Sequence, residues 1–355
     1  MPPMQEIELK LQIPEGGRDA VHQALSDLAS RQGASLSVLP LRAAYFDTPQ
    51  RHLAAGRMAL RVRQEGDAWV QTLKAAGSTT LVRVEDNQAL VPPSDPSQVS
   101  ADLSRHPAGP ARDALHSALH WDEAADPTGK HCGLVALYQT DIARTRLTLN
   151  WTWTDGADQP AQGQIELALD EGWIGAGEHR LTVCELEIEA VSGDQQAVIE
   201  AARWFVQTHG LWLDTRTKAH RGGMLADRAF GAAATSGQDG KRGKPEAAAP
   251  SAAETTALAL GAWMAELARL AARDTAQAGW PEVEWDASSW ETRNAALDQS
   301  LMTWRAQSPL ATDGLTWPPF SPPATAGEAL TWARSAPPTL ASLGLLSALL
   351  KAQAA

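Results

Sequence analysis

The strongest constraint on the fold is an alternation of aliphatic and charged residues that recurs in short segments of the first 190 residues. In EIELKL, at residues 6–11, every second residue is charged and the residues between are aliphatic. Successive side chains of a β-strand point to opposite faces, so each such segment presents one apolar and one charged face. The same pattern occurs in LRVR, VRVED, ARTRLTL, IELALD and CELEIEA. The sequence therefore predicts strands with one apolar and one charged face.

The charged faces are sorted by sign. An ordinary half-exposed strand, whose polar face meets water, explains any one segment taken alone. Here, however, some segments collect basic residues and others collect carboxylates. We therefore expect an enclosed, charged interior, with the aliphatic faces directed outward. Three predicted helices, near residues 17–32, 111–120 and 194–208, can cover those outer faces.

The charged residue types indicate a phosphate ligand. Planar guanidinium groups suit bidentate contact with phosphate oxygens. Carboxylates would repel such an anion directly, but Glu6 and Glu8 with Glu185 and Glu187 could hold Mg²⁺ or Mn²⁺, which prefer oxygen ligands. A divalent ion neutralises phosphoryl charge and lowers the pKa of bound water, so hydrolysis needs no covalent nucleophile.

Several motifs resemble, in order, those of the CYTH domains, or triphosphate tunnel metalloenzymes. They are Glu-x-Glu-x-Lys at residues 6–10, YFDT at 45–48, MALRVR, WVQTLK, RVE at 83–85, IELALDEG at 165–172, CELEIEAVSGD at 184–194 and TRTKAHRG at 215–222. The resemblance covers about residues 4–228. It implies an α+β fold: an eight-stranded antiparallel β-barrel tunnel with covering helices and the triphosphate along its axis. We expect this domain over residues 1–230.

The resemblance also implies roles for individual residues. The metal ligands are Glu6, Glu8 and a carboxylate of the CELEIEA strand, Glu185 or Glu187. The phosphate-binding residues are Lys10, Arg61, Arg63, Lys74, Arg83, Arg144 or Arg146, and one or more of Arg216, Lys218 and Arg221.

The same family pattern marks Lys10, Glu85, Glu166, Asp170 and Tyr45 as candidate catalytic residues. The three acidic residues could be ligands of a second metal, activators of water, or salt-bridge partners that orient arginines. Tyr45 is a candidate for proton transfer or, equally, a half-buried tyrosine at a strand start.

Within the family, CELEIEAVSGD and TRTKAHRG are most similar to bacterial inorganic triphosphatases, which cleave tripolyphosphate to pyrophosphate and phosphate. The alternatives are a thiamine or nucleoside triphosphatase, a class IV-type adenylate cyclase, and a noncatalytic polyphosphate-binding protein. A cyclase would need a base-recognition site, and no aromatic or amide cluster marks one. The carboxylates that the family uses to bind metal are present in this sequence, which argues against a protein that binds polyphosphate without hydrolysing it.

Composition restricts partners and location. The formal net charge of −12 argues against a nucleic-acid partner. No apolar run approaches the roughly 18 residues that span a membrane, and the first residues lack a signal-peptide pattern. We therefore expect a cytoplasmic protein whose partner is a triphosphate; the pattern makes no prediction about oligomeric state.

The last third of the chain differs in composition. Residues 231–253 are rich in Gly, Ala, Ser and Pro and are predicted to form a flexible linker. Residues 254–355 are Ala- and Leu-rich, indicating helices, and hold seven of the fourteen tryptophans, which we expect to pack together or against the first domain. In related triphosphatases a basic, histidine-rich CHAD domain often follows. Here residues 251–355 have no histidine and a net charge of −4, so we interpret the tail as a reduced CHAD-like remnant without polyphosphate binding.

Overall fold

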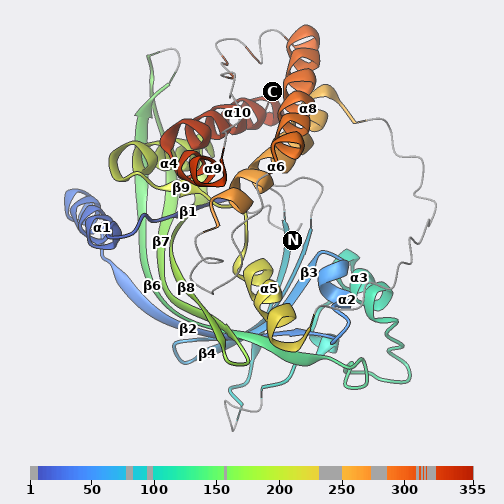
Figure 1. Ribbon diagram of the computed structural model, residues 1–355. Helices are drawn as coiled ribbons and strands as arrows, with labels where there is room; N and C mark the ends of the chain where they lie inside the picture. The colour runs from blue at the N-terminus through green and yellow to red at the C-terminus, as the bar shows by residue number, and fades with distance from the viewer. Residues whose placement is uncertain are drawn as a thin grey trace.

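A single antiparallel sheet forms the centre of the protein. The computed structural model describes residues 7–76, 83–93, 99–155, 158–231, 250–272, 286–308, 312, 315, 317 and 325–354. Nine described strands pair in the order β5-β4-β3-β2-β6-β7-β8-β1-β9 (Figure 1). They are β1 (Glu8–Gln12), β2 (Ser37–Asp47), β3 (Met58–Glu65), β4 (Ala68–Ala76), β5 (Arg83–Leu90), β6 (Val135–Thr154), β7 (Pro160–Ala176), β8 (His179–Gly193) and β9 (Trp212–Leu213).

The sheet curves strongly but does not close. The long strands β6, β7 and β8 bend around a concave face in Figure 1. Among the described residues, β5 stands at one edge and the two-residue β9 at the other, with no ladder between them. The α+β class and the antiparallel sheet are as predicted, but the closed eight-stranded barrel is not confirmed. A strand of two residues offers too few backbone groups to continue the ladder.

Helices cover the convex face where its aliphatic side chains point outward. The helices of this domain are α1 (Arg18–Gln32), α2 (His52–Ala55), η2 (Leu103–Arg105), α3 (Pro110–Leu119), α4 (Gln196–His209) and α5 (Lys218–Phe230). Leu9, Leu167 and Ile188 share a core with residues of α1 and α4. Leu60 and Leu73 do the same with residues of α2 and α3. The three helices expected from the sequence are therefore confirmed as α1, α3 and α4.

Helix α5 lies on the concave face, within the curve of the sheet (Figure 1). Its Leu225 and Ala226 pack against Ile142, Ile174 and Val183 of β6, β7 and β8. The interior is therefore charged in one part and apolar in the other, whereas the sequence predicted a charged interior throughout. Because α5 fills the apolar part, its first turn is brought to the charged part.

The C-terminal tail is helical, as predicted. Its described helices are α6 (Ala252–Leu270), α8 (Ala287–Gln307), α9 (Ala326–Ala333) and α10 (Ala336–Ala354). Trp290 lies 5.4 Å from Trp263 and 4.9 Å from Trp332 between ring centroids, so the tryptophans of separate helices form one core. Helix α6 begins inside the predicted linker, of which residues 232–249 lie outside the described chain.

The tail also packs on the first domain. Gln196 of α4 donates to the Ser347 carbonyl of α10 at 3.0 Å and accepts from the Ser347 hydroxyl at 2.7 Å. The Leu213 amide of β9 donates to the Thr339 hydroxyl at 3.2 Å. Residues of α6, α8 and α10 belong to the same hydrophobic core as α4 and β1. The tail and the sheet therefore share one core.

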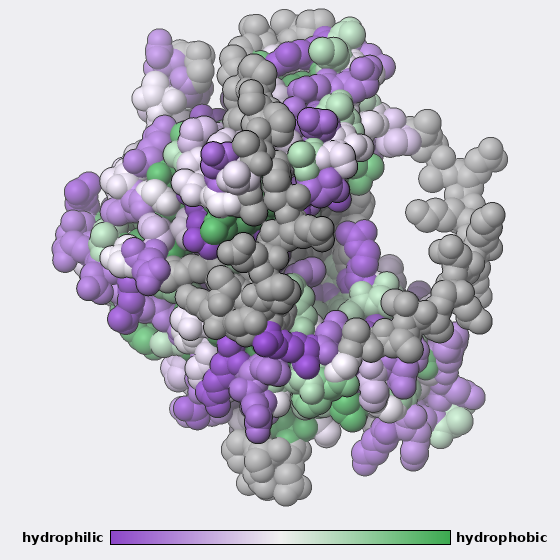
Figure 2. Space-filling model, in the orientation of Figure 1, coloured by the Kyte–Doolittle hydropathy of each residue, from purple (hydrophilic) through white to green (hydrophobic). Residues whose placement is uncertain are grey.

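Figure 2 shows the surface of one face of the molecule. On the face seen in Figure 2, hydrophilic residues predominate and hydrophobic ones form small separate patches. No described helix combines the length and the apolar character needed to cross a membrane.

We predict that Gly222→Ala destabilises the protein while Gly223→Ala does not. A Cβ at Gly222 would lie 2.2 Å from the Tyr138 ring, whereas a Cβ at Gly223 would meet nothing within 4 Å. Both changes gain the same helix propensity, so their difference isolates the clash, which overpacking data put at about 1–3 kcal/mol. Urea unfolding measures it; equal stability of the two variants would contradict the placement of α5.

Candidate functional site

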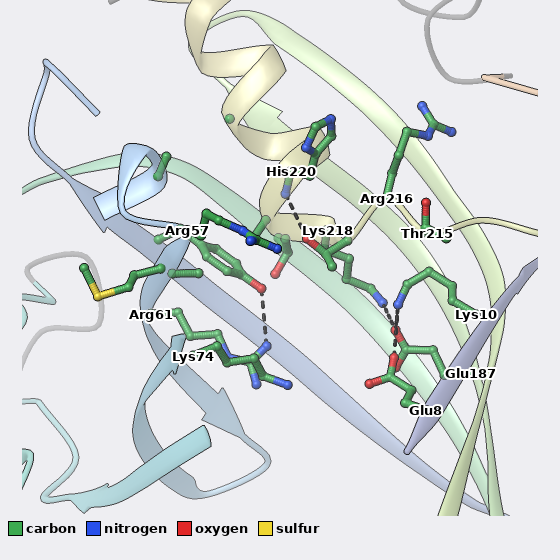
Figure 3. A pocket seen from close by; sticks show the side chains of 18 of the residues that line it. Glu8, Lys10, Arg57, Arg61, Lys74, Glu187, Thr215, Arg216, Lys218 and His220 are labelled. Carbon is green, nitrogen blue, oxygen red and sulfur yellow. Dashed lines mark hydrogen bonds and ion pairs between the residues drawn. The ribbon is translucent and has the colours of Figure 1, made fainter. Parts of the chain in front are cut away.

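A cavity of about 1410 Å³ occupies the concave side of the sheet. Its walls come from β1 to β8, from the first turns of α5, and from α6 and α8. In Figure 3, Lys10 and Lys218 converge on Glu187, while Arg61 and Lys74 lie across the same opening. The cavity thus brings together residues from both ends of the first domain.

Three carboxylates form the most buried part of the site. Strand register pairs Asp170 of β7 with Glu185 of β8, and Glu187 follows two residues later on the same face. Ligand oxygens of these three residues lie within 4.8 Å of one another. Asp170 and Glu185 are fully buried. Such a cluster requires cations close by, because burying unpaired carboxylates costs several kcal/mol each by order of magnitude.

Four basic residues supply those cations, and Lys218 is the central one. Its Nζ lies 2.5 Å from Asp170 Oδ2, 2.5 Å from Glu185 Oε1 and 2.8 Å from Glu187 Oε1. Lys10 pairs with Glu187, and Arg221 pairs with Glu185. These contacts join β1, β7, β8 and α5.

Arg144 is the fourth cation. Its Nε and Nη2 donate to the two carboxylate oxygens of Asp170 at 2.6 and 2.7 Å, and it also pairs with Glu187. Arg146 instead pairs with Glu166 and is more exposed. Both arginines line the cavity, but only Arg144 reaches the buried cluster.

The cluster is ionised on both sides. Burial alone would lower the pKa of Lys10, but Glu187, Glu8 and Glu185 raise it above its usual range. Burial would likewise raise the pKa of Glu185, but Arg221, Lys218 and Lys10 hold it well below the usual range. Opposite charges at short range stabilise the charged form of each partner, so the groups stay charged at neutral pH.

A second carboxylate group lies beside the first. Glu8 of β1 stands opposite Glu189 of β8, which in turn stands opposite Glu166 of β7. Lys10 Nζ lies 3.2 Å from Glu8 and Arg146 pairs with Glu166, whereas no described cation pairs with the Glu189 carboxylate. Its burial, together with the charges of Glu8 and Glu166, raises the pKa of Glu189. Three adjacent carboxylates, one of them without an ion pair among the described residues, form an oxygen-only donor set that fits a hard divalent ion.

Glu189 was not among the predicted ligands, although it lies on the predicted charged face of its strand. The signal that identifies it is the pairing of β1 with β8. Arg57 also lines the cavity. It lies outside the segments of alternating charged and aliphatic residues, so that pattern could not identify it as a candidate site residue. Its φ of 56° is in the left-handed region, and its side chain is exposed at the rim.

The opposite wall is basic and contains Tyr45. Arg61 donates from Nη1 to the Tyr45 hydroxyl at 3.3 Å, and its buried Nε has no hydrogen-bond partner. Lys74 Nζ lies 2.5 Å from Glu85, and Arg63 Nε donates to Glu65 at 2.6 Å. Arg61 therefore brings a buried, unused donor to this wall.

Tyr45 is buried and stacked on Tyr138, with ring centroids 4.7 Å apart. Burial would raise the pKa of Tyr45, but the charges of Arg61, Arg63 and Lys218 lower it below its ordinary value.

The remaining predicted residues divide into four groups. Arg216 lines the cavity but is held by Asp214, at 2.8 Å between Nη2 and Oδ2, and in Figure 3 it points away from the Lys10–Lys218 pair. Glu6 lies outside the described residues, as does the side chain of Arg83. Glu185 and Arg221 are buried and do not line the cavity. The cavity lining contains the others: Glu8, Lys10, Tyr45, Arg61, Arg63, Lys74, Glu85, Arg144, Arg146, Glu166, Asp170, Glu187 and Lys218.

Comparison with known proteins identifies the class. The CYTH domain family matches residues 4–222, which is more than half of the chain, and the protein belongs to this family.

Among curated relatives, the inorganic triphosphatase of Haemophilus influenzae is 27% identical over 231 residues. The match covers 64% of this chain and 56% of that relative, so the chain spans little more than half the relative's length. Two solved structures are also similar. One is a candidate adenylate cyclase from Bacillus halodurans (17% identity, 57% and 89% of the two chains, TM-score 0.36). The other is a candidate adenylyl cyclase from Hippeastrum described as having a dominant triphosphatase activity (20%, 59% and 90%, TM-score 0.34).

We predict that Arg221→Met lowers the free energy of unfolding by about 3 kcal/mol, because removing one partner of a buried ion pair leaves the other charge uncompensated. Arg221 is 1% exposed and its partner Glu185 is fully buried. Arg31→Met, at an exposed position of α1, is the matched control. Urea unfolding of both variants measures the effect. A loss below about 1 kcal/mol for Arg221→Met would show that the pair does not hold α5 on the sheet.

Proposed function

We propose that the protein hydrolyses inorganic triphosphate to pyrophosphate and phosphate with the help of Mg²⁺ or Mn²⁺. The observation that carries this proposal is the division of one cavity into two walls. Carboxylates of β1 and β8, Glu8 and Glu189, lie on one side beside Lys10, while basic residues of β3 and β4 lie across the opening. Membership of the CYTH family supports it, and so does the likeness to a relative named as an inorganic triphosphatase.

The basic residues would bind the phosphates. Arg61 offers a buried donor without a partner, and Lys10, Arg144 and Lys218 offer charge close to the carboxylates. Phosphate oxygens are strong acceptors for guanidinium and ammonium groups, so a triphosphate can compete with the carboxylates for these donors. The further phosphate-binding residues that we propose are Arg63, Lys74, Arg83, Arg146 and Arg216.

The carboxylates fit a divalent metal ion. Glu8, Glu187 and Glu189 would hold it, and Glu6 and Glu185 remain proposed ligands. Such an ion, when bound, neutralises phosphate charge and lowers the pKa of bound water.

The protein's own side chains then position the substrate. We assign Asp170 to orienting Arg144 and Lys218, Glu85 to orienting Lys74, and Glu166 to orienting Arg146, because each accepts from those cations. This favours the salt-bridge role among the alternatives for these three acids. Tyr45, with its lowered pKa beside Arg61, is the proposed group for moving a proton at its hydroxyl.

We predict that Glu8→Gln lowers turnover of tripolyphosphate by more than about 100-fold. Mutating a residue that only hydrogen-bonds to a metal ligand already lowers metal affinity or activity about 10–100-fold, and Glu8 is proposed as a ligand itself. Chelation of divalent ions should abolish turnover in the wild-type protein. Phosphate release at saturating Mg²⁺ or Mn²⁺ measures both. Glu178→Gln, at an exposed turn between β7 and β8, is the control. Turnover of Glu8→Gln equal to that of Glu178→Gln would exclude Glu8 as a ligand.

We predict that Arg61→Ala raises the KM for tripolyphosphate about 10- to 100-fold, since truncating a charged hydrogen bond costs about 1.5–3 kcal/mol and 1.4 kcal/mol is tenfold. Arg42→Ala removes the same charge from the outer face of β2, where Arg42 pairs with Asp141 at 3.3 Å. Steady-state kinetics of the two variants gives the comparison. If both variants keep the wild-type KM and kcat, the basic wall does not contact the substrate.

A further inference from the structure

We propose that the C-terminal helices supply a second phosphate-binding group to the cavity, formed by Arg269 of α6 and Arg293 of α8. The inference rests on the proposed function, because it takes the ligand to be a chain of phosphates. It extends that function to residues outside the family match at 4–222.

The tail forms part of the cavity wall. Helix α6 lines it with Ala262, Ala265, Glu266 and Arg269, and helix α8 lines it with Arg293. These residues border the same continuous cavity as Lys10 and the carboxylates of β8. A ligand that extends beyond the sheet therefore meets the tail helices rather than open solvent alone.

The charge of this wall is positive. Glu266 is 5% exposed and accepts from Arg269 at 3.0 Å (Nε) and 2.6 Å (Nη2), while Arg293 Nε lies 3.8 Å away. Both guanidinium groups thus lie beside Glu266. The buried Nε of Arg293 makes no hydrogen bond. A guanidinium with an unused buried donor is suited to a phosphate oxygen.

The distribution of charge in the tail also supports phosphate binding by Arg269 and Arg293. Its net charge of −4 suggested that it does not bind polyphosphate. Among the described tail residues that line the cavity, however, two are basic and only Glu266 is acidic. The tail therefore directs positive charge inward although it is acidic overall. None of those lining residues is aromatic, which favours a phosphate over a nucleobase as the group that the tail contacts.

The two arginines are presented from a fixed surface. Helix α6 starts at a capping box between Ser251 and Glu254 and packs on α8 and α10. Helix α10 is joined to α4 through Gln196 and Ser347. A wall held in this way keeps the guanidinium groups in place before the ligand binds, which reduces the entropy lost on binding.

The test measures binding of tripolyphosphate and tetrapolyphosphate to the full chain by titration calorimetry, with KM and kcat alongside. The variants are Arg269→Ala/Arg293→Ala and, to keep side-chain length, Arg293→Gln. Arg31→Ala, on α1, is the charge-matched control, and thermal unfolding checks folding. We expect the Kd of the double variant to rise at least about tenfold, with a smaller rise for Arg293→Gln and little change in kcat. A higher Kd for both ligands would mean that the tail contacts the third phosphate of the chain. A higher Kd for tetrapolyphosphate alone would mean that the tail contacts a fourth phosphate.

The inference would be overturned if Arg269→Ala/Arg293→Ala and Arg293→Gln both bind tripolyphosphate and tetrapolyphosphate with wild-type affinity. Binding without hydrolysis by the wild-type protein would contradict the proposed function, while the effect of the variants on Kd would still decide the role of the tail. A wild-type protein that binds neither tripolyphosphate nor tetrapolyphosphate would contradict both proposals.

Discussion

The buried ion cluster of Asp170, Glu185 and Glu187 with Lys10, Lys218, Arg144 and Arg221 governs the arrangement of the first domain. Charges are expensive to bury unless each meets a partner in good geometry, and here the partners come from β1, β6, β7, β8 and α5. The cluster therefore links the start of the domain, at Lys10, to its end, at Arg221. It also explains why α5 lies inside the curve of the sheet, since only there can its first turn reach the carboxylates.

The charges of the buried cluster largely neutralise one another, and the charged groups beside the cluster are the ones that a ligand can meet. Glu8, which pairs with Lys10 at 3.2 Å, and Glu189, which has no ion pair with a described residue, stand beside the cluster. Arg61 stands across the cavity with a donor to spare. A metal ion and a phosphate chain would satisfy the two sides together, because the ion binds both carboxylate and phosphate oxygens. Arg269 and Arg293 extend the basic side into the tail. The proposed hydrolysis thus depends on charges that the fold brings close and that a metal ion and a phosphate chain can bind.

Much of this could be predicted from local pattern, and the rest depends on contacts far apart in sequence. Alternation with a period of two identified the charged and apolar faces, and the helical pattern identified α1, α3 and α4. The role of Glu189 depends on its pairing with Glu8, which is 181 positions earlier in the chain. Lys218 rather than Arg216 reaches the carboxylates because Asp214 holds Arg216, while Thr217 caps α5 and starts the helix at Lys218. The openness of the sheet and the position of Arg293 follow from packing of whole elements, for which a single segment carries no signal.

The central claim is that the charged cavity holds a triphosphate and splits it. Phosphorus-31 NMR of tripolyphosphate incubated with the full chain and Mg²⁺ tests this most directly, because it identifies the products as well as the turnover. We expect equal amounts of pyrophosphate and phosphate to appear as the triphosphate signals disappear. Intact tripolyphosphate, together with pyrophosphate and a cyclic nucleotide formed from ATP in a parallel sample, would contradict it and indicate a cyclase.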